Sequence, residues 1–172
     1  ALLALACFHS SRFDARKNDQ GELILYRDQD ETLWNKKLIS KGAYFLKQAS
    51  HGDKVTKYHL EAAIAWWHTN KADTKEKWRN ILQLYNSLLI LDYSSVAALN
   101  RTYAFSKVYG KEAAITEAEK LNLTDNHYYY TLLGELYKSI NRSQAKRHYQ
   151  KAFSLAKTTA DKRIIQQNID SL

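Results

Sequence analysis

Apolar residues recur every three or four positions along most of the chain, which is the spacing of amphipathic helices. Such stripes follow one another from residue 56 to the end, and polar residues separate them. The helices that these stripes predict cover 56–67, 78–89, 95–110, 112–121, 128–140, 143–157 and 160–172. Short connections favour antiparallel packing of consecutive helices. We therefore expect an all-α fold, a right-handed stack of antiparallel helix hairpins with about nine helices.

The first fifty residues have a less regular pattern. We expect a first helix over 1–16, which is apolar nearly all round as far as Phe8 and should be buried on more than one side. The composition of 17–21 predicts a turn. The next five residues, 22–26, are short and could be extended. A second helix should begin at Asp28–Glu31, carry Trp34 on its apolar face and end near Ser50.

Two helix boundaries have clear chemical signals. Ser94 or Ser95 can cap a helix that ends at Gly110, because glycine adopts a positive φ at a helix end without steric cost. Thr158 or Thr159 can cap the last helix.

The most regular internal pattern lies near the end of the chain. It comprises Tyr130, Leu133, Gly134, Tyr137, Ala145, Tyr149 and Ala152. This spacing resembles the tetratricopeptide repeat (TPR), in which small residues let paired helices approach closely. Gly134 would permit that approach with Ala145 as its small partner, while Tyr137 and Tyr149 fill the wider gaps. Weaker echoes upstream extend the expectation to one TPR-like domain over 1–172, with an irregular helical bundle as the alternative.

Composition narrows the classes of protein. The 172 residues include one Cys, no Pro and no run of 18 apolar residues, which excludes a disulfide framework, a multi-cysteine zinc site and a membrane span. The chain begins with Ala inside an apolar run, so we expect a domain of a longer protein. A lipoprotein signal ending at Cys7 is the alternative, but it lacks a basic region. We expect Cys7 to be a small buried residue.

No catalytic motif is present. The six His residues lack the spacing of a zinc site, and the chain contains neither a glycine-rich phosphate loop nor a nucleophile elbow. We therefore expect no enzymatic activity, catalytic residue, metal or cofactor. His9 and Arg12, three positions apart on the expected first helix, could bind an anion. The simpler interpretation is a polar edge on a packed helix.

Charge is unevenly distributed in this basic chain, whose net charge is +8. Residues 136–172 hold 8 basic and 2 acidic side chains. The candidate basic patch comprises Lys138, Arg142, Lys146, Arg147 and Lys151. Such asymmetry is typical of contact with nucleic acid. The alternative is a solvated capping hairpin, since the end of a helical stack needs a polar outer face.

Several short motifs occur in a fixed order along the chain. They are Leu2-Leu3-Ala4-Leu5, Phe8-His9-x-x-Arg12, Gln29-Asp30-x-x-x-Trp34, Leu60-x-Ala62-Ala63-Ile64-Ala65 and Val96-x-Ala98-Leu99-Asn100-Arg101. In this order the chain resembles the C-terminal extension of extracytoplasmic-function (ECF) sigma factors of the sigma-70 type. Glu31 departs from the family pattern, which has Arg there, and Ser94-Ser95 stand where a proline is common.

The resemblance implies a cytoplasmic regulatory domain of a transcription initiation factor. The complete protein would carry two N-terminal modules that bind core RNA polymerase and promoter DNA. This domain would contact its own sigma modules, core RNA polymerase or another regulatory protein, and no membrane. The candidate partner-binding residues are Arg12, Gln29, Asp30, Trp34, Asn100 and Arg101. In the structural alternative, Asn100 bridges helix backbones and Asp30 caps a helix. Two functional alternatives remain: nucleic-acid binding through 136–172, and a TPR-like scaffold unrelated to sigma factors.

Overall fold

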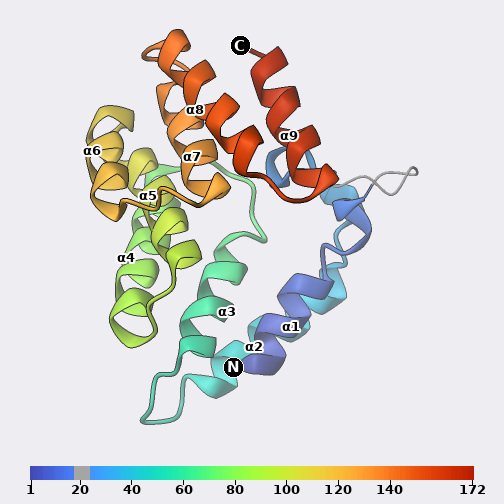
Figure 1. Cartoon of the computed structure of the whole chain (residues 1–172). Helices are drawn as coiled ribbons and strands as arrows, with labels where there is room; N and C mark the ends of the chain where they lie inside the picture. Colours follow the sequence, from blue (N-terminus) through green and yellow to red (C-terminus); the bar gives the residue numbers. More distant parts are fainter. Residues whose placement is uncertain (18–23) are drawn as a thin grey trace. The chain divides into compact units, whose positions relative to one another are not determined.

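The computed structural model describes residues 1–17 and 24–172, which are organised as two compact units, 1–93 and 94–172 (Figure 1). The described residues form nine α-helices and short 3₁₀ turns, with no β-strand. The prediction of an all-α, TPR-like fold with about nine helices is confirmed.

The first unit is built from four helices: α1 (Leu2–Ser10), α2 (Lys36–Ala49), α3 (Lys57–Trp67) and α4 (Lys75–Leu91). Helix α1 packs against both α2 and α3, and α4 packs against α3. A core cluster containing Ala4, Phe8, Ala62 and Ala65 joins the first three helices. Cys7 is buried on α1, as its apolar surroundings in the sequence predict.

The segment between α1 and α2 differs from the sequence prediction. Helix α1 ends at Ser10, not near Arg16. The Ser11 hydroxyl donates to the Phe8 carbonyl oxygen at 2.7 Å, and the Ser11 carbonyl accepts from the Asn35 amide, so the chain turns there. Three 3₁₀ turns follow, at Asp14–Arg16, Tyr26–Asp28 and Glu31–Leu33. Of the expected turn at 17–21, only Lys17 lies within the described residues. Of the stretch 22–26, residues 24–26 are described; Leu25 has an extended backbone, and Tyr26 begins a 3₁₀ turn.

The second helix begins later than Asp28–Glu31. Its first residue is Lys36, because the Asn35 side chain accepts a hydrogen bond from the Leu38 amide at 3.0 Å and caps the helix. Trp34 therefore precedes the helix, where it is 2% exposed. Asp30 caps only the short turn Glu31–Leu33, since its carboxylate accepts from the Thr32 amide and hydroxyl.

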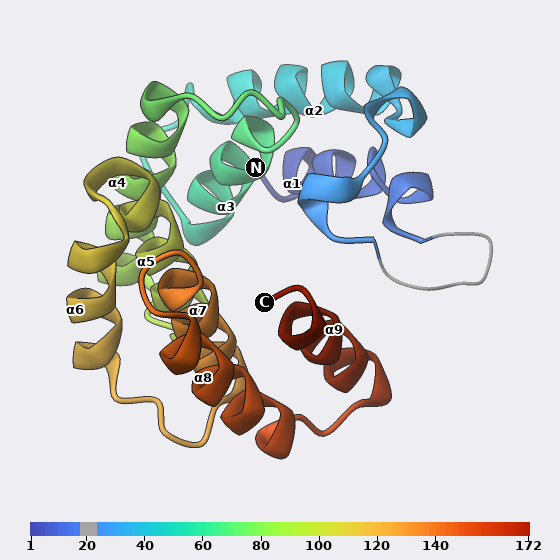
Figure 2. The same ribbon diagram turned by 90° about the horizontal axis from the view of Figure 1, so that it is seen from above.

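The second unit contains five helices: α5 (Ser95–Tyr109), α6 (Lys111–Leu121), α7 (His127–Tyr137), α8 (Arg142–Leu155) and α9 (Thr159–Asp170). Each helix packs against the next, and α5 also contacts α7. Figure 2 shows α7 and α8 side by side. Ser94 caps α5 and Thr158 caps α9, which decides between the two candidates at each position. Gly110 has a φ of 96° between α5 and α6, as a glycine there predicts.

One close contact is common to both units: an aromatic ring lies against a helical glycine. A Cβ atom added at Gly134 would lie 2.7 Å from ring atoms of Tyr149, and one added at Gly42 would lie 2.7 Å from Phe8 Cε1. Gly134 thus permits the close approach that the repeat pattern predicts. The Tyr149 ring occupies the space beside Gly134. Ala145, which precedes Tyr149 by one helical turn, is fully buried.

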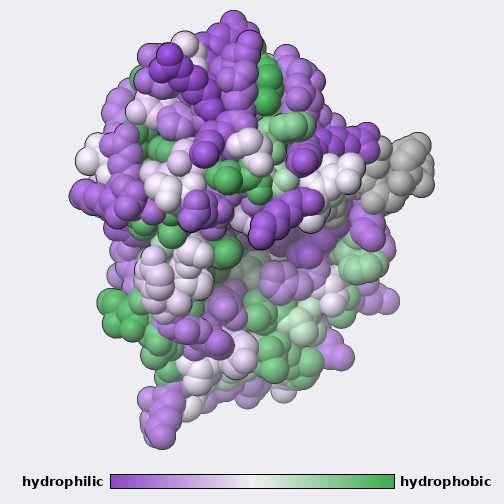
Figure 3. Space-filling view, in the orientation of Figure 1, coloured by the Kyte–Doolittle hydropathy of each residue, from purple (hydrophilic) through white to green (hydrophobic). Residues whose placement is uncertain are grey.

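The surface over α8 and α9 is mainly hydrophilic (Figure 3). No helix in the described part of the chain is long and apolar enough to cross a membrane.

Candidate functional site

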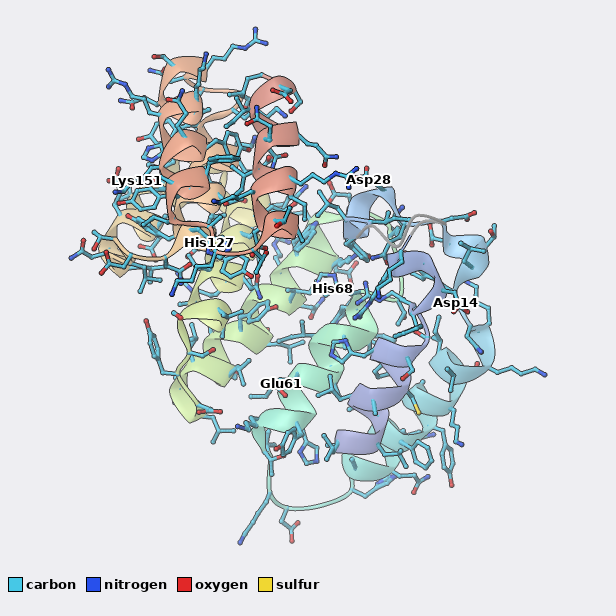
Figure 4. The ribbon with its side chains drawn as sticks, turned by 45° about the vertical axis from the view of Figure 1, so that its right-hand side comes forward. Asp14, Asp28, Glu61, His68, His127 and Lys151 are labelled. Atoms are coloured by element: carbon cyan, nitrogen blue, oxygen red, sulfur yellow. The ribbon has the colours of Figure 1, made fainter. Side chains whose placement is uncertain are left out.

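The richest group of polar and aromatic side chains lies in the first unit. We call it the aromatic–basic cluster, and its members are Arg12, Tyr26, Gln29, Trp34, His68, Lys77 and Trp78. They come from the segment between α1 and α2, from the residue that follows α3, and from α4. Figure 4 labels His68 at the end of α3.

Arg12 is a cation buried among aromatic rings. It is 9% exposed, and its guanidinium carbon lies 5.2 Å from the centre of the Tyr26 ring and 5.8 Å from that of Trp34. Burial lowers the pKa of Arg12, and the positive charge of Arg16 lowers it further. Its Nε atom has no hydrogen-bond partner in the described part of the chain. Cation–π contacts therefore replace the usual carboxylate partner.

Tyr26 connects the cluster to the loop that precedes α4. Its hydroxyl donates to the Asn70 carbonyl oxygen at 3.2 Å. The Lys77 ammonium donates to the Tyr26 oxygen at 3.3 Å and also to the Asn70 carbonyl, and Lys77 is 3% exposed. Burial raises the pKa of Tyr26 to about 12, so its phenol stays protonated at neutral pH.

His68 lies between two rings. The centre of its imidazole is 5.2 Å from that of Tyr26 and 6.0 Å from that of Trp78, both in edge-on arrangements. Burial lowers the pKa of His68 to about 4, and the charges of Lys77 and Arg12 add to the effect. The imidazole is therefore neutral at pH 7. Its Nδ1 atom is buried without a partner among the described residues.

Gln29 and Trp34 complete the cluster. Gln29 is 6% exposed, and its side-chain Nε2 donates to the Ile24 carbonyl at 3.3 Å. The backbone carbonyl oxygen of Gln29 accepts from Lys71 Nζ at 2.8 Å. Within the part of the chain that the structure describes, Gln29 Oε1 and Trp34 Nε1 are buried without hydrogen-bond partners. The Trp34 ring stacks on Tyr26 with centres 6.2 Å apart.

The structure groups only half of the predicted partner-binding residues. Arg12, Gln29 and Trp34 belong to the cluster, whereas the exposed Asp30 carboxylate is occupied by its own turn. Asn100 and Arg101 belong to the other unit. There Asn100 is exposed, and Arg101 pairs with Glu117 at 2.7 Å.

His9 is exposed, whereas Arg12 is buried. His9 Nδ1 lies 3.2 Å from Arg16 Nη2. Because the helix ends at Ser10, Arg12 no longer follows His9 on one helical face.

The candidate basic patch lies mainly on the outer surface of α8. Arg142, Lys146, Arg147 and Lys151 are exposed, and Figure 4 labels Lys151 on this helix. Lys138 is half-buried and donates to the Ser171 hydroxyl at 2.8 Å. The patch is therefore four exposed cations on one helix.

Among the residues that the structure describes, no group of three or more His, Cys, Asp or Glu side chains could hold a metal ion.

Comparisons with known proteins find relatives without an established activity. Residues 1–50 match a family of unknown function (DUF6596). The whole chain is similar to an uncharacterized protein of Rhizobium meliloti (strain 1021), with 34% identity over 176 residues that cover 99% of this chain and 41% of that protein. The chain thus spans about two fifths of the length of this relative. No solved structure matches the chain. The matched family region contains Arg12, Tyr26, Gln29 and Trp34 of the aromatic–basic cluster.

Proposed function

We propose that this chain is a regulatory, protein-interaction module of an ECF sigma factor and acts in the cytoplasm by contacting the factor's own sigma modules. The observation that carries the proposal is the outer face of α1. Leu2 and Leu3 are 58% and 54% exposed, and Ala6 on the same face is exposed too. The opposite face, with Ala4 and Phe8, packs against α2 and α3.

A helix at a protein surface normally has a polar outer face. Helix α1 has none before His9, so its exposed leucines are available to a partner. Burying a leucine side chain contributes about 1.5–3 kcal/mol when burial is complete, and about half of that remains to be gained at Leu2 and at Leu3. A free energy of this size is in keeping with the docking of one module of a protein on another module of the same protein.

Two further findings support a partner within the same protein. The Rhizobium relative is more than twice as long as the aligned region. In addition, the ordered motifs resemble those of ECF sigma factors, in which polymerase-binding and promoter-binding modules precede such an extension. The sigma modules are therefore the partner that we favour over core RNA polymerase or a separate regulatory protein.

The proposal is tested with the full-length factor and with its parts. We expect the sigma modules, supplied as a separate polypeptide, to bind residues 1–172. The double substitution Leu2→Ser and Leu3→Ser should weaken binding about ten-fold, in keeping with the loss of two half-buried leucine contacts. The matched control is Ile90→Ser on α4, because Ile90 is 89% exposed and lies elsewhere in the unit.

Binding is measured by calorimetry, and the effect on function by transcription with core RNA polymerase from a cognate promoter. The proposal is wrong if wild-type residues 1–172 do not bind the sigma modules and if deletion of residues 1–172 from the full-length factor leaves promoter-directed transcription unchanged. A reading frame without sigma modules upstream of Ala1 would also contradict it.

A second candidate function is nucleic-acid binding through α8. Four exposed basic side chains on one helix favour it. Binding through phosphate contacts would weaken steeply as salt is raised. The double substitution Arg147→Gln and Lys151→Gln should then reduce the salt dependence measured by gel shift. An absence of binding to DNA and RNA at low salt would eliminate this candidate.

A further inference from the structure

The aromatic–basic cluster contains hydrogen-bonding atoms that the described part of the chain leaves unused. Arg12 Nε, Trp34 Nε1 and His68 Nδ1 are all buried without partners. Arg12 and Trp34 are more than nine-tenths buried. The three side chains lie around Tyr26. The centre of the Tyr26 ring is 5.2 Å from the guanidinium carbon of Arg12. It is 6.2 Å from the ring centre of Trp34 and 5.2 Å from that of His68. The three side chains that carry the unused atoms therefore all lie beside the Tyr26 ring.

These atoms have a common chemical character. Arg12 Nε and Trp34 Nε1 are obligatory donors. His68 is neutral at pH 7, so Nδ1 donates in the tautomer that carries its proton there. Leaving a buried donor unpaired destabilises a protein, and a charged donor costs more. The remaining unused atom, Gln29 Oε1, is an acceptor and cannot donate to an anion.

The charges in the cluster indicate what would satisfy the donors. Arg12 makes no ion pair with another described residue. The phenol of Tyr26 opposes the lowering of the Arg12 pKa, and no carboxylate is among the groups that act on it. The second buried cation, Lys77, already donates to the Asn70 carbonyl and to Tyr26. The charge of Arg12 is thus met by two aromatic rings and by no carboxylate of a described residue. A singly charged anion would balance it, whereas a doubly charged phosphate would bring an additional buried charge without a partner.

We propose that Arg12, Trp34 and His68 form a binding site for a single carboxylate group. The planar guanidinium fits a carboxylate, and the indole and imidazole N–H groups supply neutral donors beside it. Arg16 is half-buried and close enough to Arg12 to lower its pKa, so a second positive charge lies near the site. This site goes beyond the proposed function, because carboxylate binding does not require sigma modules.

The source of the carboxylate is either a small organic acid or an acidic side chain of a protein. Both present the same group, and they differ in what is attached to it. We compare sodium acetate with the tripeptide acetyl-Gly-Glu-Gly-amide, and we use inorganic phosphate and sodium chloride as other anions at equal ionic strength. Affinity for the peptide at least ten times that for acetate assigns the site to an acidic protein segment. Equal affinities assign it to a small acid. Either outcome supports a carboxylate site.

The binding experiment uses ¹⁵N-labelled protein of residues 1–172 at pH 7. The chain has four tryptophans and therefore four indole N–H signals, of which Trp34→Phe identifies one. We expect acetate to shift the Trp34 indole and Arg12 Nε–H signals in a saturable way. Arg12→Gln should weaken binding at least about ten-fold, and Trp34→Phe about three-fold, because it removes one neutral donor and keeps an aromatic ring.

Trp66→Phe is the matched control, since Trp66 is 41% exposed and contacts the Trp67 ring edge-on outside the cluster. Its affinity for acetate should equal that of the wild type. The remaining indole signals and the helical circular dichroism show whether each variant is folded. The proposal is overturned if neither acetate nor the peptide causes a saturable shift. It is also overturned if Trp34→Phe is folded and binds as the wild type does, or if phosphate binds at least as tightly as both carboxylate probes.

Discussion

At the scale of the residue, His68 shows how neighbours set the charge of one side chain. Burial is the main cause of its low pKa, and Lys77 and Arg12 add positive charge, while Tyr26 and Trp78 present ring edges. The pKa is about 4 in the folded protein and 6.5 in an unfolded chain, so the unfolded state binds more protons between these values. Stability contributed by neutral His68 is present above pH 6.5 and is lost as the pH falls toward 4.

We therefore expect the free energy of unfolding to decrease on acidification, with a share from His68 of about 3 kcal/mol by pH 4. His68→Phe keeps an aromatic ring and removes the titration, so this share should disappear. Urea unfolding of both proteins at several pH values between 7 and 4, followed by tryptophan fluorescence, measures the difference. Identical pH dependence of wild type and variant would show that His68 is not the group responsible.

The members of the aromatic–basic cluster were accessible from sequence to different degrees. Arg12, Gln29 and Trp34 are marked by the order of motifs, and they do lie together. Tyr26, His68 and Lys77 are not marked. His68 and Lys77 meet Tyr26 only when α3 and α4 pack into the first unit. Long-range packing of this kind leaves no periodic signal in the chain.

At the scale of the element, three helix ends were predictable from local chemistry. Ser94, Thr158 and Gly110 fix helix ends through local hydrogen bonds or backbone angles, which sequence records directly. The end of α1 was not predictable in this way. The pattern continues to favour a helix beyond Ser10, but burial of Arg12 among aromatic rings favours a turn.

The ring-on-glycine contacts are also element-scale features. Gly42→Ala and Gly134→Ala should each lower the free energy of unfolding by about 1–2 kcal/mol. Overlap with the Phe8 or Tyr149 ring costs about 1–3 kcal/mol, and the better helix propensity of alanine offsets part of it. Gly52→Ala is the control, because its Cβ would lie 3.8 Å from the nearest atom. Thermal and urea unfolding compare the three variants, and equal stabilities would refute the packing role.

At the scale of the whole molecule, the described core clusters each lie within one unit. One joins helices of 1–93, and two others lie within 94–172. We expect the fragments 1–93 and 94–172, produced separately, to show helical circular dichroism and cooperative melting. Gly42→Ala should then affect only the first fragment, and Gly134→Ala only the second. Unfolded fragments would favour the single domain that the repeat pattern predicts.

The chain has one cysteine, and its sulfur lies on the packed side of α1. A thiol reagent can reach it only when this helix separates from its neighbours. The rate at which Cys7 is alkylated therefore measures how often the first unit opens, and no label has to be introduced. The leucines proposed to dock on another module lie on the same helix. Alkylation of Cys7 should therefore become slower when that module binds.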